Sequence, residues 1–276
     1  MTLTEMQPNL LVAGLNFPEG PAFDEEGNLW AVELKGGGLV RWRDGTLRRI
    51  ATGGAPNGIA IDRQGRINFC DAEQCSIRRY DPVLETCETI ASEVDGMPLF
   101  RPNDLAFDPR RTLIFTNPGD SRQEPTGYVC ALTAVGAVRK IATHFHFCNG
   151  LAFTPDGREL IVAETYRQRL WRGEWDADRV CWIKPRIWAE GLLGVPGPDG
   201  MAFAGDGTLF VAVYGSGRIM RVDEDGTIVE HLTTPGNNPT NCAFDPSGRL
   251  GLVVTEAERG EILSLPLSLS GARLQN

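Results

Sequence analysis

One pattern, a short apolar strand, a tight turn and a second apolar strand, occurs six times along the 276 residues of this chain. Its clearest copy is CNGLAFTPDGRELIVAE, from Cys148 to Glu164, in which a Pro-Asp-Gly turn separates two apolar runs. The interval between copies accommodates four short strands and leaves no room for helices between them. One alanine marks the same position in every copy, at intervals of 38 to 50 residues: Ala22, Ala60, Ala106, Ala152, Ala202 and Ala243.

The second half of each copy completes a four-stranded unit. Segments such as GGLVRWRDGTLRRI and GSGRIMRVDEDGTIVEHL supply a third strand, a turn and a fourth strand. Antiparallel sheets arranged radially bury their apolar faces on their neighbours and leave only short edges. We therefore predict an all-β fold, a six-bladed β-propeller of four-stranded antiparallel blades, with residues 1–276 as a single domain. Ring closure should pair the strand at 9–13 with the strand at 261–265.

The charge balance narrows the class of partner. The chain has 27 basic and 36 acidic residues, a net charge of −9 and a pI near 5.0. Such a surface repels nucleic-acid phosphates and anionic lipid, so we expect neither a nucleic-acid nor a membrane partner, and a small molecule or a cation fits better. The sequence has no membrane-length apolar window, and its start lacks the pattern of a secretory signal, so we predict a cytoplasmic protein.

The nucleophilic residues do not form a recognisable catalytic motif. The seven cysteines lack C-x-x-C spacing, which favours reduced, mostly buried thiols over a disulfide framework or a zinc site. There is no G-x-S-x-G sequence, and none of the three histidines stands in a triad context.

Polar residues occupy one position in all six copies, three residues before the marker alanine. In a propeller the innermost strands line the central channel, so equivalent residues should lie at one height around the axis. Two carboxylates, three amides and a hydroxyl would then converge on one point, without any basic or apolar side chain among them. These ring residues are Glu19, Asn57, Asn103, Asn149, Asp199 and Thr240.

Such a ring offers oxygen ligands and negative charge, which suit a divalent cation; calcium, magnesium, manganese or zinc would each be satisfied. The alternative is that Asn or Asp followed by Gly simply forms turns, and this alternative stays open for Asn57. It is weaker for Glu19 and Asp199, because Glu is a poor turn residue and two facing acids without a cation would raise each other's pKa.

Four motifs, in this order and spacing, give the chain a resemblance to a known family. They are FPEGP at 17–21, RPND at 101–104, CNGLAFTPDGRELIVAET at 148–165 and GPDGMAF at 197–203. Over essentially its whole length the chain resembles the six-bladed propellers of the gluconolactonase, regucalcin (senescence marker protein) and luciferin-regenerating-enzyme family. The resemblance implies one divalent metal held by Glu19, Asn149 and Asp199, with Asp199 as general base. It also implies that Asn103 contacts metal-bound water or substrate and that Arg101 binds substrate oxygens.

These residues favour a metal-dependent hydrolase, a lactonase that opens a sugar-derived or similar small lactone by attack of water on a metal-polarised carbonyl. The alternatives are a metal-dependent phosphotriesterase or esterase, and a non-catalytic propeller whose metal only stabilises a binding module. Arg101 could instead pair with a surface acid. His144, His146 and the loop at 117–127, with Asn117, Asp120, Ser121 and Glu124, lie near the expected mouth and receive no role.

Overall fold

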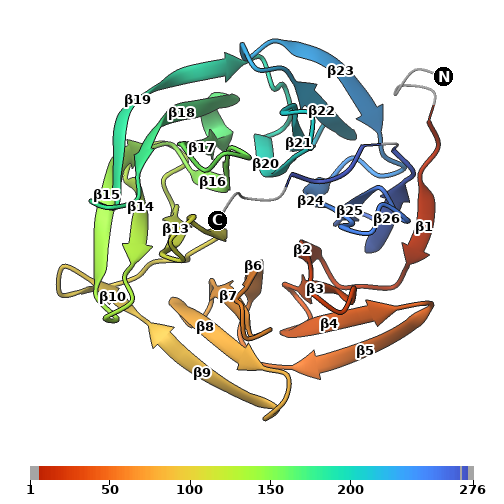
Figure 1. Ribbon diagram of the computed structural model, residues 1–276, viewed down its shortest axis with the longest axis horizontal. Helices are drawn as coiled ribbons and strands as arrows, with labels where there is room; N and C mark the ends of the chain where they lie inside the picture. The colour runs from red at the N-terminus through yellow and green to blue at the C-terminus, as the bar shows by residue number, and fades with distance from the viewer. Residues whose placement is uncertain (1–5, 268, 273–276) are drawn as a thin grey trace.

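The structure, a computed structural model that describes residues 6–267 and 269–272, consists of six four-stranded antiparallel sheets arranged in a ring (Figure 1). The predicted six-bladed β-propeller is therefore confirmed. Within the described residues, no helix is long and apolar enough to cross a membrane. All seven cysteines are free, and Cys70, Cys130, Cys148 and Cys242 are buried.

The first three blades follow one another along the chain, each with its first strand nearest the axis. A small hairpin, β10 (Glu93–Val94) and β11 (Met97–Pro98), links the second blade to the third. Blade 1 contains β2 (Pro18–Phe23), β3 (Leu29–Glu33), β4 (Gly38–Arg43) and β5 (Thr46–Ala51). Blade 2 contains β6 (Pro56–Ile61), β7 (Ile67–Asp71), β8 (Ser76–Asp81) and β9 (Thr86–Ala91). Blade 3 contains β12 (Leu105–Phe107), β13 (Leu113–Asn117), β14 (Gly127–Leu132) and β15 (Val138–Phe145).

The last three blades complete the ring, and a 3-10 turn at Thr165–Arg167 interrupts the fourth. Blade 4 contains β16 (Cys148–Phe153), β17 (Glu159–Glu164), β18 (Arg169–Asp176) and β19 (Cys181–Glu190). Blade 5 contains β20 (Gly197–Phe203), β21 (Leu209–Tyr214), β22 (Arg218–Val222) and β23 (Ile228–Thr233). Blade 6 contains β24 (Pro239–Phe244), β25 (Leu252–Glu256), β26 (Glu261–Leu265) and β1 (Asn9–Val12).

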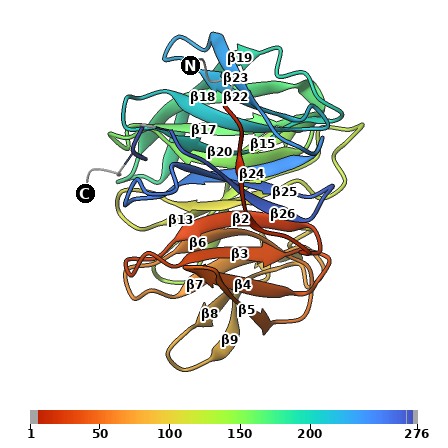
Figure 2. The ribbon, with the colours of Figure 1, turned by 90° about the vertical axis from the view of Figure 1, so that its right-hand side faces the viewer.

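The N-terminal strand closes the ring, as predicted. Strand β1 pairs antiparallel with β26, with Asn9 opposite Ser264 and Leu10 opposite Leu263. Seen from the side, β1 runs along the outer edge of blade 6, next to the start of blade 1 (Figure 2). The last blade is thus built from both ends of the chain, which couples them.

The core lies between blades and follows from the alternation of side chains along each strand. In β3, Leu29 and Ala31 pack towards blade 6, in a cluster with Val253 and Ile262. The intervening Trp30 and Val32 pack towards blade 2. Because a blade is buried on both faces, its inner strands read as nearly continuous apolar runs.

Candidate active site

The ring residues stand at the start of the innermost strands, where the strand geometry is irregular. Asn57 and Asn149 lie within β6 and β16, and Asp199 lies within β20. The pairing of these three strands with their neighbours shifts register at the same place, as it does in β2 at Glu19. A β-bulge re-aims a side chain, and here it repeats from blade to blade. The Asn-Gly and Asp-Gly pairs are therefore strand residues, so the turn interpretation of Asn57 is wrong.

Close packing between neighbouring strands explains why glycine follows the ring residue in most blades. A Cβ atom on Gly150 would stand 2.2 Å from the backbone oxygen of Asp199, and one on Gly58 would stand 2.0 Å from Asp104 Oδ1. A Cβ on Gly200 would meet the side chain of Asn241 at 1.9 Å. Neighbouring inner strands thus approach closely only because these positions have no side chain. This close approach brings the ring residues together.

A cavity of about 400 Å³ opens above the ring. Five of the six ring residues line it, which agrees with the predicted convergence. Thr240 does not line it, so the sequence prediction is wrong there. The fully buried Thr240 hydroxyl donates to the Pro18 carbonyl at 2.9 Å and lies 2.8 Å from the Thr255 hydroxyl. The ring residues that line the cavity are Glu19, Asn57, Asn103, Asn149 and Asp199.

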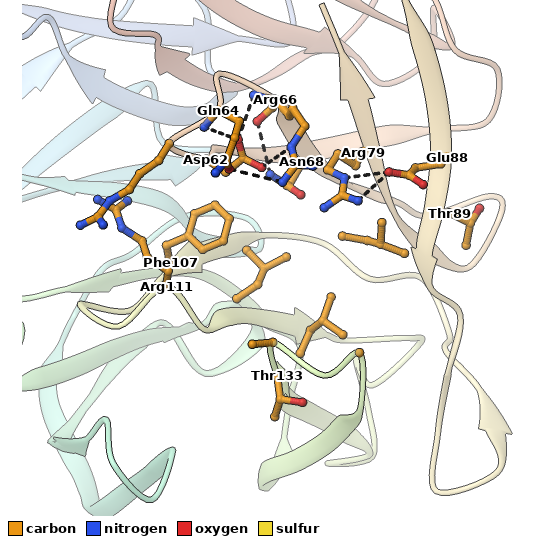
Figure 3. Close-up of a pocket in the computed structure, with 16 residues that line it drawn as sticks. Asp62, Gln64, Arg66, Asn68, Arg79, Glu88, Thr89, Phe107, Arg111 and Thr133 are labelled. Carbon is orange, nitrogen blue, oxygen red and sulfur yellow. Dashed lines mark hydrogen bonds and ion pairs between the residues drawn. The ribbon is translucent and has the colours of Figure 1, made fainter. Parts of the chain in front are cut away.

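Larger cavities that contain none of the ring residues lie elsewhere. One, of about 520 Å³, lies on the outer strands of blade 3. Two others are larger still. One, of about 660 Å³, is the opposite end of the channel, lined mainly by apolar residues of the inner strands and by residues 270–272. The other, of about 600 Å³, is a cleft between blades 2 and 3 (Figure 3). There Arg66 forms an ion pair with Asp62 at 2.8 Å, and Arg79 forms one with Glu88 at 2.6 Å. We therefore place the candidate site in the smaller cavity.

The ring contains buried carboxylates whose negative charges are not balanced by basic side chains. Glu19 is 4% exposed and Asp199 is 9% exposed. Burial, with the nearby Asp104 carboxylate as the second cause, raises the pKa of Glu19 to about 8. Burial, followed by the charges of Glu19 and Asp104, raises the pKa of Asp199 well above its ordinary value. In the described part of the chain, no Lys, Arg or His forms an ion pair with any of these three acids.

Two residues at the floor of the site were missed by the sequence reasoning. The Asn241 side-chain amide donates to Glu19 Oε2 at 3.3 Å and to Asp104 Oδ2 at 3.4 Å, so it joins the two carboxylates. Burial raises the pKa of Asp104 to about 7. Both residues stand one position after the ring residue, where the other four copies have glycine. That departure from glycine was the available signal.

The buried amide oxygens of the ring are suitable ligands for a cation. Asn149 donates through Nδ2 to Thr165 Oγ1 at 3.1 Å, and Thr165 in turn donates to the Pro198 carbonyl at 2.7 Å. This fixes the amide, yet Asn149 Oδ1 is buried without a partner, as is Asn57 Oδ1. An unpartnered buried acceptor is costly, and a hard cation would satisfy it. Within the described residues, no three His, Cys, Asp or Glu side chains form a metal cluster by themselves, so such a cation would depend on amide oxygen.

The two predicted substrate-binding residues both line the cavity. Asn103 has a fixed backbone, because its N–H donates to Thr116 O at 3.0 Å and its carbonyl accepts from Gly58 N at 2.9 Å. Arg101 is exposed, and its guanidinium lies 5.7 Å from the centre of the Phe100 ring. In the described chain no carboxylate pairs with Arg101, so the surface-acid alternative is not observed.

The named residues that received no predicted role do not line the cavity. His144 contacts the Thr143 hydroxyl and His146 contacts Arg167, and neither histidine lines the cavity. In the 117–127 loop, Asn117 exchanges two hydrogen bonds with the Phe100 backbone. From this loop Pro118, Gly119 and Arg122 reach the cavity, whereas Asn117, Asp120, Ser121 and Glu124 do not.

Comparison with known proteins agrees with the propeller fold. Residues 17–258 match the model of the SMP-30/Gluconolactonase/LRE-like region. The chain is 28% identical to a diisopropyl-fluorophosphatase of Loligo vulgaris, over 92% of this chain and 90% of the relative. It is also 28% identical to the lactonase drp35 of Staphylococcus haemolyticus, over 80% of this chain and 70% of the relative. A solved gluconolactonase of Xanthomonas campestris superposes with a TM-score of 0.84 at 25% identity, covering 98% of this chain and 91% of its own.

Proposed function

Because the chain belongs to the SMP-30/Gluconolactonase/LRE-like family, we propose that it is a metal-dependent hydrolase that opens a small lactone by attack of water on the ring carbonyl. The relatives support a hydrolase, since they are named lactonase, gluconolactonase and diisopropyl-fluorophosphatase. The lactone is the first choice because two of these three names specify that bond.

One observation carries the proposal: the fixed and unpartnered Asn149 Oδ1 shares a cavity with two buried, unpaired carboxylates. A site of this kind is unfavourable by itself, because burial penalises each charge. It becomes favourable when a cation is bound. Glu19, Asn149 and Asp199 would hold one divalent cation, and this cation would polarise a carbonyl oxygen and lower the pKa of a bound water.

The protein's own groups would carry the remaining steps. Asp199 takes a proton from the attacking water and returns it to the departing ring oxygen. A bond forms between the water oxygen and the carbonyl carbon, the ring C–O bond breaks, and the product is a hydroxy carboxylic acid. Arg101 and Asn103 orient the substrate by donating to its oxygens.

The test combines activity with cation binding. Metal-free protein is assayed on a panel of lactones before and after addition of Ca²⁺, Mg²⁺, Mn²⁺ or Zn²⁺. We expect turnover only with a cation present, and loss of turnover on chelation. Asp120→Asn is the matched control, because this exposed rim carboxylate does not line the cavity and should leave turnover unchanged.

Two results would contradict the proposal. Lactone hydrolysis that persists after complete chelation would remove the cation from the chemistry. A protein that binds a cation and gains thermal stability, yet opens no lactone, would instead be a metal-stabilised binding module.

Phosphotriester hydrolysis is the second candidate, favoured by the match to diisopropyl-fluorophosphatase over 92% of this chain. The same donors could stabilise charge on a phosphoryl oxygen. Inclusion of a fluorophosphate in the panel separates the two: a fluorophosphate turned over much faster than any lactone would replace the first proposal by the second.

A further inference from the structure

Three residues at the rim of the cavity have an unusual backbone conformation. Phe17, Arg101 and Phe147 have φ angles of 61°, 54° and 66°. Each stands two residues before a ring residue, so this left-handed conformation recurs at one position of the repeat. Bulky side chains rarely adopt it, because the Cβ atom crowds the backbone. Its recurrence in three blades points to a function for the side chains that it displays.

The same type of side-chain to backbone hydrogen bond holds all three residues in place. In each of these three blades, the last residue of the second strand accepts a hydrogen bond from the peptide N–H just before the left-handed residue. Glu33 accepts from Asn16 at 2.9 Å, Asn117 from Phe100 at 3.1 Å, and Glu164 from His146 at 2.7 Å. The rim conformation is therefore imposed by buried side chains of the blades.

The result is an aromatic wall above the polar floor. Phe17 stacks with Tyr214, with ring centres 6.3 Å apart and planes at 24°. Phe147 packs against Tyr166 with ring centres 5.6 Å apart. All four rings line the cavity. Phe17 and Phe147 come from blades 1 and 4, which lie on opposite sides of the ring (Figure 1).

Further apolar residues extend this wall, and four polar groups also reach it. Leu34, Pro102, Pro118 and Pro196 contribute further apolar surface. The polar groups of the wall are two tyrosine hydroxyls and the guanidinium groups of Arg101 and Arg122. A sugar lactone carries a hydroxyl on most of its carbons, and each hydroxyl placed against this wall would lose hydrogen bonds to water. A planar apolar group would instead bury its surface between the rings.

We propose that the substrate is a lactone whose ring carries, or is fused to, an apolar and preferably aromatic group, rather than a polyhydroxylated sugar lactone. Its carbonyl reaches the floor at Glu19, Asn149 and Asp199, and its apolar part lies between Phe17 and Phe147. This proposal rests on the lactonase function proposed above and specifies its substrate class.

The experiment compares substrates of equal ring size: a benzo-fused δ-lactone, an alkyl δ-lactone and glucono-δ-lactone. The variants are Phe17→Gly and Phe147→Gly, since glycine suits a left-handed backbone and removes the ring without new strain. Val135→Ala, at an 89% exposed position outside the cavity lining, is the control. Melting temperatures confirm that each variant is folded.

We expect the benzo-fused lactone to have a kcat/KM at least tenfold above that of glucono-δ-lactone. Each glycine variant should lower the value for the benzo-fused lactone about tenfold and the value for glucono-δ-lactone less than twofold. Equal or better turnover of glucono-δ-lactone, or an equal loss for both substrates, would overturn the proposal.

A binding measurement separates this proposal from the lactonase function. The benzo-fused δ-lactam, an unreactive amide analogue, is titrated calorimetrically into the wild-type protein and both glycine variants. Suppose that no lactone is opened, but the lactam binds the wild type and binds the variants at least tenfold more weakly. This result would exclude the lactonase function and support the binding of an apolar group by the aromatic wall. If the lactam does not bind, or binds all three proteins equally, the inference fails, whatever the activity.

Discussion

Two kinds of buried carboxylate occur in this propeller, and they differ in their partners. Glu256, at the end of β25, is fully buried and accepts hydrogen bonds from the backbone N–H groups of Asn238 at 2.9 Å, Glu258 at 3.1 Å and Arg259 at 2.7 Å. Its charge is dispersed over backbone donors that join two loops. This carboxylate has a structural role.

Glu19 is as deeply buried but poorly partnered. It accepts from the Gly20 backbone and, at 3.3 Å, from Asn241, and the Asp104 and Asp199 carboxylates lie near it. Burial raises its pKa to about 8. The comparison suggests a distinction between the two acids: burial alone does not mark a functional acid, whereas burial with few donors and with other carboxylates nearby does. Glu256 completes the fold, whereas Glu19 and Asp199 are the acids that we propose as cation ligands.

The largest expected effect is chemical. Asp199→Asn should lower kcat by about 10³-fold, because the amide cannot accept the proton of the attacking water. Steady-state kinetics at saturating cation measure the change. Unchanged turnover in this variant would exclude Asp199 as the base, and a normal melting temperature would show that misfolding is not the cause.

The structural acid should behave in the opposite way. Glu256→Ala leaves three backbone N–H groups without their acceptor, so the free energy of unfolding should fall by about 3 kcal/mol. Urea unfolding measures this loss, while kcat of the folded variant should stay within twofold of the wild type. A fall in kcat without a fall in stability would place Glu256 with the functional acids and remove the contrast.

An intermediate effect is expected for the residue beneath the ring. Asp104→Asn removes a negative charge that acts on Glu19, so cation affinity should fall by about 10-fold to 100-fold, as for other residues that support metal ligands. Calorimetric titration at constant pH gives the affinity. An affinity within twofold of the wild type would show that Asp104 only fills the channel.

The smallest effect is a pH dependence of the cation-free protein. In the folded state the pKa of Glu19 is raised from 4.5 to about 8, and that of Asp104 from 3.8 to about 7. The folded state therefore binds more protons than the unfolded state between about pH 4 and pH 8. Stability is greatest below this window and falls as pH rises through it, by at most about 1.4 kcal/mol per pH unit for each group.

Urea unfolding of the cation-free protein at several pH values measures this slope. Asp104→Asn should show a shallower decline, and a saturating cation should oppose it. Stability that stays constant or rises between pH 5 and pH 8 in the cation-free wild type would show that these acids are better partnered than the structure indicates.

The sequence predicted the blades because their signal is repeated. Six copies of one pattern establish the strand order, and the apolar run at 9–13 was the obvious candidate to close the ring. Glu19 and Asp199 stood out because acids replace amides at one repeated position. Thr240 was misassigned because its hydrogen bond reaches blade 1, across a contact between blades that no local pattern encodes.

Other features depend on close contacts in three dimensions. Asp104 and Asn241 meet only because glycines elsewhere in the ring let the inner strands approach one another. The left-handed rim was hidden because Phe17, Arg101 and Phe147 are residue types that usually avoid it. Their conformation is imposed by side chains 16 or 17 residues away in the sequence, such as Glu33 and Asn117.

The central claim, that unpaired carboxylates and an orphaned amide oxygen form a cation site, is tested most directly by calorimetric titration of the metal-free protein with Ca²⁺, Mg²⁺, Mn²⁺ and Zn²⁺. The account predicts one ion per chain for at least one of these cations, with binding lost in Glu19→Gln and Asn149→Ala and retained in Asp120→Asn. Absence of binding by the wild-type protein, or equal binding by Asn149→Ala, would contradict it.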